Sequence, residues 1–113
     1  MEIEGPLNIS VQYDDETSPK RELHLSFKPA FIQQKVFERI ETMQSYMDHL
    51  KHHLQKLSHD DPDRPGIETI YQICENLLEN IRLDELDLNE TIILEIQPTV
   101  NISNFLTGHS TIN

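Results

Sequence analysis

The sequence is poor in the residues that build disulfide scaffolds and phosphate-binding loops. It contains one cysteine, so no intramolecular disulfide is possible and a disulfide-rich secreted fold is excluded. It has three glycines and contains neither G-x-G-x-x-G nor G-x-x-x-x-G-K-[ST], whose glycines let a backbone surround phosphate groups. The hydrolase pattern G-x-S-x-G and the zinc-protease pattern H-E-x-x-H are absent as well. We therefore predict that the protein is not an enzyme and uses no cofactor.

Long apolar runs are also missing. No stretch approaches the roughly 18 apolar residues that a membrane-spanning helix requires. The opening residues, MEIEGPLNIS, have neither the basic region nor the apolar region of a signal peptide. These two observations predict a cytoplasmic protein with no membrane partner.

Basic residues are scarce, with 9 lysines and arginines against 20 acidic residues and a net charge of −11. This balance argues against nucleic-acid binding, which depends on a basic face that neutralises phosphates. The charge is unevenly distributed, because residues 28–59 hold five bases and three acids, whereas residues 60–113 hold two bases and eleven acids. A weakly basic segment is therefore set within an acidic chain.

The length of 113 residues is typical of one domain, which we expect to span residues 1–113. Near the N-terminus, apolar and polar residues alternate in two short runs, with a polar segment between them. Alternation of this kind indicates half-buried strands, so residues 1–28 are predicted to form a β-hairpin with His24 on its polar face. The apolar positions are Leu7, Ile9, Val11, Tyr13, Leu23, Leu25 and Phe27.

After Pro29 the apolar spacing changes from two residues to alternating four and three. This spacing predicts one long helix at about residues 30–58, with Met47 and Leu50 buried along its apolar seam. Phe37 and Tyr46 are expected to widen that seam. The seam positions are Val36, Ile40, Met43, Met47, Leu50, Leu54 and Leu57.

A second apolar stripe follows the helix-breaking segment SHDDPDRPG. It predicts a helix at about residues 66–82, antiparallel to the first, with Cys74 as an unreactive core thiol. The run TIILEIQP predicts a strand at residues 90–97, in a sheltered position because apolar residues occupy both of its faces. Residues 98–113 are expected to form a partly flexible tail.

These elements predict an α+β fold of order ββααβ. A small antiparallel sheet, made of the hairpin and the C-terminal strand, would pack on an antiparallel helical hairpin. Because the first helix is predicted to be about ten residues longer than the second, part of its seam lacks a partner within the chain. We therefore expect a homodimer formed through the long helix. In the alternative arrangement, the acidic connector covers that seam through Leu83, Leu86 and Leu88.

Four of the six histidines fall between His49 and His59. His49 and His53 stand four residues apart on one helical face, which is the spacing of a two-histidine metal clamp. A zinc site needs at least three protein ligands, and no cysteine pair is present to supply the others. We interpret the histidines as a hydrated polar face and expect no metal. A metal site and a pH-sensing role remain the alternatives.

The sequence points to a non-enzymatic protein-interaction module, such as an adaptor, an assembly or secretion chaperone, or a regulator. An acidic mimic of nucleic acid is one alternative, since a protein of this charge could occupy a basic groove. A divalent-metal-binding protein is another, because DLNET places oxygen ligands at alternate positions. Lys51 and Lys56 could instead simply offset the acids of the second helix. The residues expected to contact a partner are Lys51, His52, Leu54, Lys56, Leu57, Asp84, Glu85 and Asp87.

Overall fold

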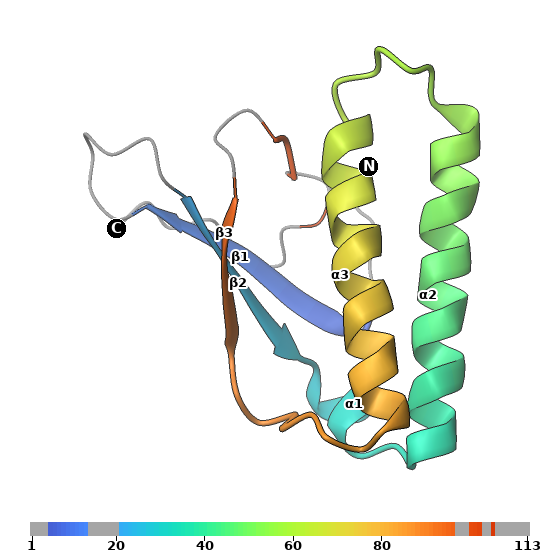
Figure 1. Cartoon of the computed structure of the whole chain (residues 1–113), viewed down its shortest axis with the longest axis vertical. Coiled ribbons are helices and arrows are strands. Elements are labelled where there is room, and N and C mark those ends of the chain that lie inside the picture. The colour runs from blue at the N-terminus through green and yellow to red at the C-terminus, as the bar shows by residue number, and fades with distance from the viewer. Residues whose placement is uncertain (1–4, 14–20, 97–99, 103–104, 106–113) are drawn as a thin grey trace.

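The computed structural model describes residues 5–13, 21–96, 100–102 and 105. A three-stranded sheet lies on one side of the molecule and two long antiparallel helices lie on the other (Figure 1). This arrangement confirms the predicted α+β fold and the order ββααβ, to which the structure adds one short helix. The elements are β1 (Leu7–Tyr13), β2 (Arg21–Phe27), α1 (Pro29–Ile32), α2 (Val36–Lys56), α3 (Arg64–Arg82) and β3 (Ile92–Ile96).

The sheet has the order β1-β2-β3, and both neighbouring pairs are antiparallel. The predicted alternation is confirmed, because Ile9 pairs with Leu25 and both side chains are buried. His24 pairs with Ser10 on the opposite face of the sheet, as the alternation requires, and is half-buried there. The face that carries Ile9 and Leu25 therefore forms one wall of the core.

The other wall of the core comes from α2 and α3. Met47 and Leu50 are buried, which confirms that the heptad seam of α2 faces inward. Cys74 is fully buried on α3, and burial raises the pKa of its thiol to about 12, consistent with an unreactive core residue. The buried residues of the two helices are Met43, Tyr46, Met47, Leu50, Gly66, Ile67, Ile70, Cys74, Leu77 and Ile81.

The prediction of one long helix at residues 30–58 is wrong. The chain leaves α1 after Ile32 and begins α2 only at Val36. The Arg39 guanidinium donates hydrogen bonds to the carbonyls of Phe31 and Ile32, at 3.4 and 2.7 Å, and so satisfies groups that a continuing helix would have used. Phe31 also stacks on Phe27 at 5.2 Å between ring centroids, which holds α1 against the end of β2.

This break removes the reason for expecting an uncovered seam. The helices α2 and α3 have 21 and 19 residues, so they are nearly equal in length. Leu54 and Leu57 are half-buried and pack against the core. Leu86 and Leu88 of the connector also pack on it, although Leu83 is exposed. Dimerisation through α2 therefore loses its premise.

Three apolar residues lie in more exposed positions than expected. Phe37 is 60% exposed at the start of α2 rather than part of the buried seam. The strand β3 pairs only with β2 among the described residues and forms one edge of the sheet. The expectation of a sheltered strand was wrong, because in the described part of the chain no further strand lies beside β3 to cover its side chains on either face. Ile93 and Leu94 are 53% and 36% exposed.

The turn between α2 and α3 is fastened by Arg64. Its guanidinium donates to the carbonyls of Leu54 and Leu57 at 2.9 and 3.3 Å, which are among the last carbonyls of α2. The same side chain forms an ion pair with Glu68 at 2.9 Å, one turn further along α3. One cation thus joins the end of α2 to the start of α3.

The end of α3 contains a residue in an unfavourable backbone conformation. Asp84 has a φ of 54°. Its N–H donates to the Ile81 carbonyl, and the Glu85 N–H donates to the Asn80 carbonyl, both at 3.1 Å. This is the Schellman pattern, in which the position held by Asp84 is usually glycine because a Cβ is disfavoured at positive φ.

We expect Asp84→Gly to raise the free energy of unfolding by about 1 kcal/mol, because glycine relieves that strain. Urea denaturation followed by circular dichroism measures the change. Asp84→Ala is the matched control, since it removes the same charge but keeps a Cβ. An equal gain in both variants would mean that charge, and not backbone conformation, limits stability at this position.

Candidate binding groove

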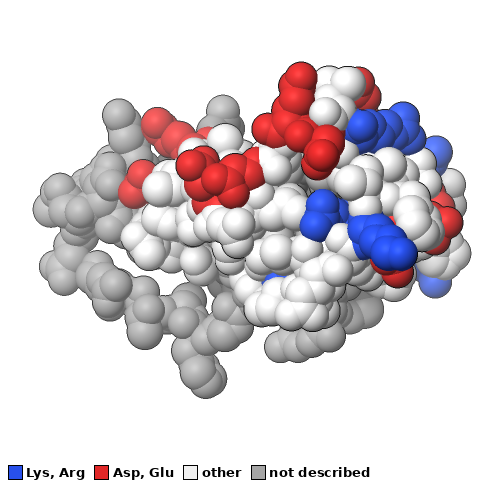
Figure 2. Space-filling view, turned by 90° about the horizontal axis from the view of Figure 1, so that it is seen from below, with Lys and Arg blue, Asp and Glu red and all other residues white. Residues whose placement is uncertain are grey.

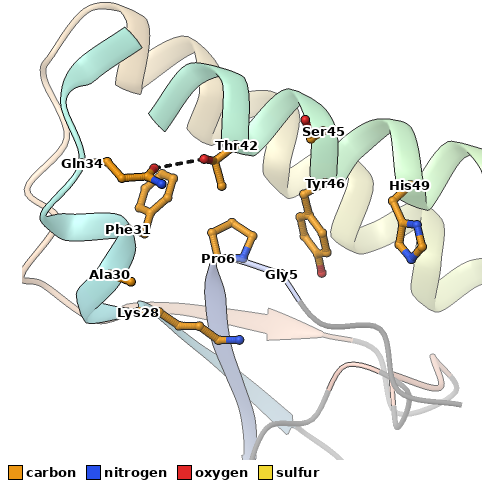
Figure 3. Close-up of a pocket in the computed structure, with 10 residues that line it drawn as sticks. All are labelled: Gly5, Pro6, Lys28, Ala30, Phe31, Gln34, Thr42, Ser45, Tyr46 and His49. Atoms are coloured by element: carbon orange, nitrogen blue, oxygen red, sulfur yellow. Dashed lines mark hydrogen bonds between the residues drawn. The ribbon is translucent and has the colours of Figure 1, made fainter. Parts of the chain in front are cut away.

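A groove of about 500 Å³ runs between α2 and the ends of β1 and β2 (Figure 3). One wall is a single face of α2, because Thr42, Ser45 and His49 are spaced three and four residues apart and Tyr46 lies between them. The other wall combines the two residues that precede β1 with the segment joining β2 to α1. The residues of that wall are Gly5, Pro6, Lys28, Ala30, Phe31 and Gln34.

Three contacts hold the walls in place. The Lys28 N–H donates to the Pro6 carbonyl at 2.9 Å, which ties the two chain segments of the sheet-side wall together. The Thr42 hydroxyl donates to the Gln34 side-chain oxygen at 3.0 Å and closes one end of the groove (Figure 3). The stacking of Phe31 on Phe27 fixes α1 beneath that end. The shape of the groove is therefore set by contacts within the protein.

The close approach of the two walls depends on Gly5. A Cβ at this position would overlap the Tyr46 ring. Tyr46 is buried, and this burial raises the pKa of its phenol well above the ordinary value. Its ring remains neutral and presents an apolar surface to the groove near Pro6 (Figure 3).

The charge of the groove differs from that of the molecule. The chain has 20 acidic residues, yet among the described residues no Asp or Glu lines the groove. Lys28 and His49 are the groups in the lining that can carry positive charge. Lys28 extends along the sheet-side wall, with its ammonium toward the side where Tyr46 and His49 lie (Figure 3). The groove thus combines apolar walls with a cationic character.

A second hollow, of about 370 Å³, lies on the outer side of the helical hairpin. It is lined by Gln44, Met47, Asp48, Tyr71 and Leu78. Its described lining has a carboxylate and no cation, and comes from α2 and α3 alone. The charge of this hollow therefore does not differ from that of the acidic surface, whereas the charge of the groove does.

The histidine pair is brought together as the spacing predicted. The rings of His49 and His53 meet edge to face, with centroids 4.7 Å apart. Partial burial lowers the pKa of His53, and the neighbouring His49, Lys56 and His52 add to this effect. Within the described ranges, no group of three or more His, Cys, Asp or Glu side chains is placed to hold a metal ion. The pair alone is too small a ligand set for zinc.

The residues predicted to contact a partner do not form one site. Lys51, His52 and Lys56 are exposed near the end of α2. The acids of the connector, Asp84 and Asp87 among them, follow the end of α3 at the opposite end of the helical hairpin (Figure 1). Glu85 is likewise exposed in the connector, whereas Leu54 and Leu57 pack on the core.

The proposed offset of the acids of α3 by lysines is also not seen. The ion pairs found among the described residues are those of Arg64 with Glu68 and of His24 with Glu22, the latter at 4.0 Å. Lys51 and Lys56 take part in neither. Their charges are therefore directed to solvent rather than across the hairpin.

The surface charge at the connector end is divided. Figure 2 views the molecule from this end and shows acidic side chains in separate groups, with basic side chains next to the larger group. A mimic of nucleic acid would instead present regular rows of acids on one surface. The visible face therefore gives no support to that alternative.

Sequence reasoning missed the groove. Its α2 wall was visible only as polar residues beside Tyr46, which are also expected on any solvated helix flank. Its second wall comes from segments at residues 5–6 and 28–34, and nothing in the sequence indicates that these two segments adjoin.

In the part of the chain that is described, no helix has the length and apolar character needed to cross a bilayer. Comparisons with protein-family models, with curated proteins and with solved structures give no match to this chain.

Proposed function

We propose that the protein is a non-enzymatic interaction module that holds a short acidic and apolar segment of a partner protein in the groove. The observation that carries this proposal is the described lining of the groove, which is mostly apolar and includes no carboxylate in a chain of net charge −11. Electrostatic complementarity of this kind selects partners more than it adds affinity. A partner with acidic residues around an apolar anchor fits the lining best.

The shape of the groove favours a chain segment over an enclosed small molecule. Its volume of about 500 Å³ lies within the usual range of ligand sites, but one long side is open to solvent. A peptide can lie along such a trough with one side chain against Pro6, Phe31 and Tyr46. The Ser45 hydroxyl and the Gln34 amide group supply polar partners for its backbone.

The charged groups set the orientation of the segment. A carboxylate near Lys28 would meet a cation without meeting an opposing acid among the described lining residues. The remaining acids of the protein would repel misplaced acidic segments from other surfaces. The groove is thus a region where an acidic segment meets little repulsion from the described residues.

The test uses the full chain and two amidated model peptides, acetyl-Asp-Leu-Phe-Glu and acetyl-Lys-Leu-Phe-Lys. Binding is followed by shifts of backbone amide signals in nuclear magnetic resonance spectra. We expect the acidic peptide to shift signals of residues 28–34 and 42–49, and the basic peptide to leave them unchanged. Lys28→Glu should weaken binding at least about tenfold, which corresponds to 1.4 kcal/mol or more.

Lys51→Glu is the matched control, because it changes net charge equally at an exposed site outside the groove. It should alter the dissociation constant less than about twofold if screening limits long-range effects. Equal losses in both variants would assign the binding to overall charge. Shifts spread over other surfaces, or equal binding of the basic peptide, would refute the proposed site.

A further inference from the structure

We propose that the free edge of β3 pairs with β3 of a second copy of the chain, so that two sheets join into one six-stranded antiparallel sheet. This inference rests on β3 and is independent of the groove. It also places the expected homodimer at a different surface, away from α2.

The backbone of β3 is suited to pairing. Among the described residues its one neighbour in the sheet is β2, so its other side presents unpaired N–H and C=O groups. Its register with β2 runs from Ile92 to Ile96 without a skipped residue, which leaves no bulge to distort the edge. The strand contains no proline and no lysine, the residues that commonly protect edges from pairing.

The strand β3 exposes an apolar side chain on each face of the sheet, with Glu95 beside the one on the outer face. Ile93 pairs with His24 on the outer face and is 53% exposed. Leu94 pairs with Leu23 on the core face and is 36% exposed. An added strand would cover both side chains at once, because successive residues point to opposite faces.

The other edge of the sheet does not share this character. Along β1 the residues of the outer face are Asn8, Ser10 and Gln12, which are polar. Exposed polar edges bond well to water and gain little from a partner strand. The apolar character of its exposed residues therefore selects β3 over β1.

The sequence of β3 is complementary to itself. Antiparallel pairing centred on Leu94 sets Ile92 of one copy opposite Ile96 of the other and Ile93 opposite Glu95. The two Glu95 carboxylates then do not face each other, which avoids the penalty for like charges directly opposite. Within one chain Glu95 already pairs with Glu22, so a partner strand that offers isoleucine is the better neighbour. A two-fold axis through Leu94 produces this pairing.

Electrostatics predicts how the dimer responds to salt. Each copy carries a net charge of −11, so the two copies repel each other. The screening length falls from about 30 Å at 0.01 M salt to about 3 Å at 1 M, so added salt should favour association. An interface of one strand pair is small, and such interfaces form weak, concentration-dependent complexes.

The experiment is sedimentation equilibrium of the full chain at protein concentrations from about 10 μM to about 1 mM, in low and in high salt. We expect the average mass to rise above 13.2 kDa with concentration, and to rise further in high salt. Leu94→Lys should reduce the association constant at least about tenfold, because it sets two lysines directly opposite each other at the two-fold axis. Hydrogen exchange should show that the amides of β3 gain protection as the wild-type protein associates.

Leu83→Lys is the matched control. Leu83 is 56% exposed, lies outside the sheet and undergoes the same change of charge. Because both variants lower the net negative charge equally, loss of the dimer in Leu94→Lys alone cannot be due to a change in overall charge. A 13.2 kDa monomer at every concentration and salt level would overturn the proposal. So would association that Leu83→Lys reduces as much as Leu94→Lys does.

Discussion

Leu50→Ala is expected to lower the free energy of unfolding by about 2–5 kcal/mol. Leu50 has no exposed surface and lies on α2 in the middle of the core between the sheet and α3. Its truncation removes buried apolar surface and leaves a cavity that close-packed neighbours fill only in part. Chemical denaturation followed by circular dichroism at neutral pH measures the loss as a lower midpoint.

Leu83→Ala is the control for this prediction. It deletes the same atoms at a site that is 56% exposed, so the change in free energy should stay within about 0.5 kcal/mol. A similar midpoint shift for both variants would contradict the packing of α2 on the sheet.

The burial of Leu50 was predictable because helical periodicity is a local property. Val36 and Lys56 bound α2, and the alternating spacing of four and three begins at Val36 itself. The error in predicting one long helix concerned the residues before Val36. Pro29 does start a helix, but that helix is α1 and it ends at Ile32. The break depends on hydrogen bonds from Arg39 back to α1 and on the stacking of Phe31, which periodicity does not reveal.

The position of β3 in the sheet illustrates a different limit. Its apolar residues correctly predicted a strand, and the structure places it at Ile92–Ile96. A strand that is apolar on both faces is typical of a sheet interior. Whether β3 lies at the edge or in the centre of the sheet is decided, however, by which strands pair with one another, and that pairing is a property of the whole fold. The same residues therefore give an exposed apolar edge.

The candidate site was predictable only in part. The exposure of Lys51 was predictable because Lys51 lies outside the apolar seam of α2. The exposure of Asp84 was predictable because Asp84 lies in the connector. Their separation followed from the antiparallel hairpin, which puts the end of α2 and the end of α3 at opposite ends of the molecule (Figure 1). The groove required knowledge that Gly5 and Lys28 both adjoin the middle of α2. Only tertiary structure supplies that information.

The second large effect on the free energy of unfolding is expected where the C-terminal segment contacts α3. Residues 100–102 pass over the first turn of α3, where Ile102 is buried and the Asn101 amide donates to the Asp63 carboxylate at 3.0 Å. The Arg21 guanidinium also donates to the Val100 carbonyl at 2.6 Å, which links this segment to β2. The approach to α3 is possible because Gly66 has no side chain.

Gly66→Ala is expected to lower the free energy of unfolding by about 1–3 kcal/mol. In an exposed helix the same change stabilises by about 1 kcal/mol, because alanine has the higher helix propensity. At Gly66 the sign reverses, since the new Cβ would overlap the backbone carbonyl of Asn101. A backbone group cannot rotate away as a flexible side chain does. Thermal or urea denaturation measures the loss, and Asn76→Ala, at an exposed position of α3, should change stability by less than about 0.5 kcal/mol.

A double-mutant cycle identifies the origin of this loss. If the Cβ at position 66 lifts the segment from α3, Ile102 is no longer packed in the variant. Ile102→Ala should then cost about 2–5 kcal/mol in the wild-type background, as for other buried isoleucines, and much less in the Gly66→Ala background. Equal costs in both backgrounds would mean that the segment stays in place and that α3 itself is displaced. A Gly66→Ala protein as stable as the wild type would show that residues 100–102 do not pack on α3 at all.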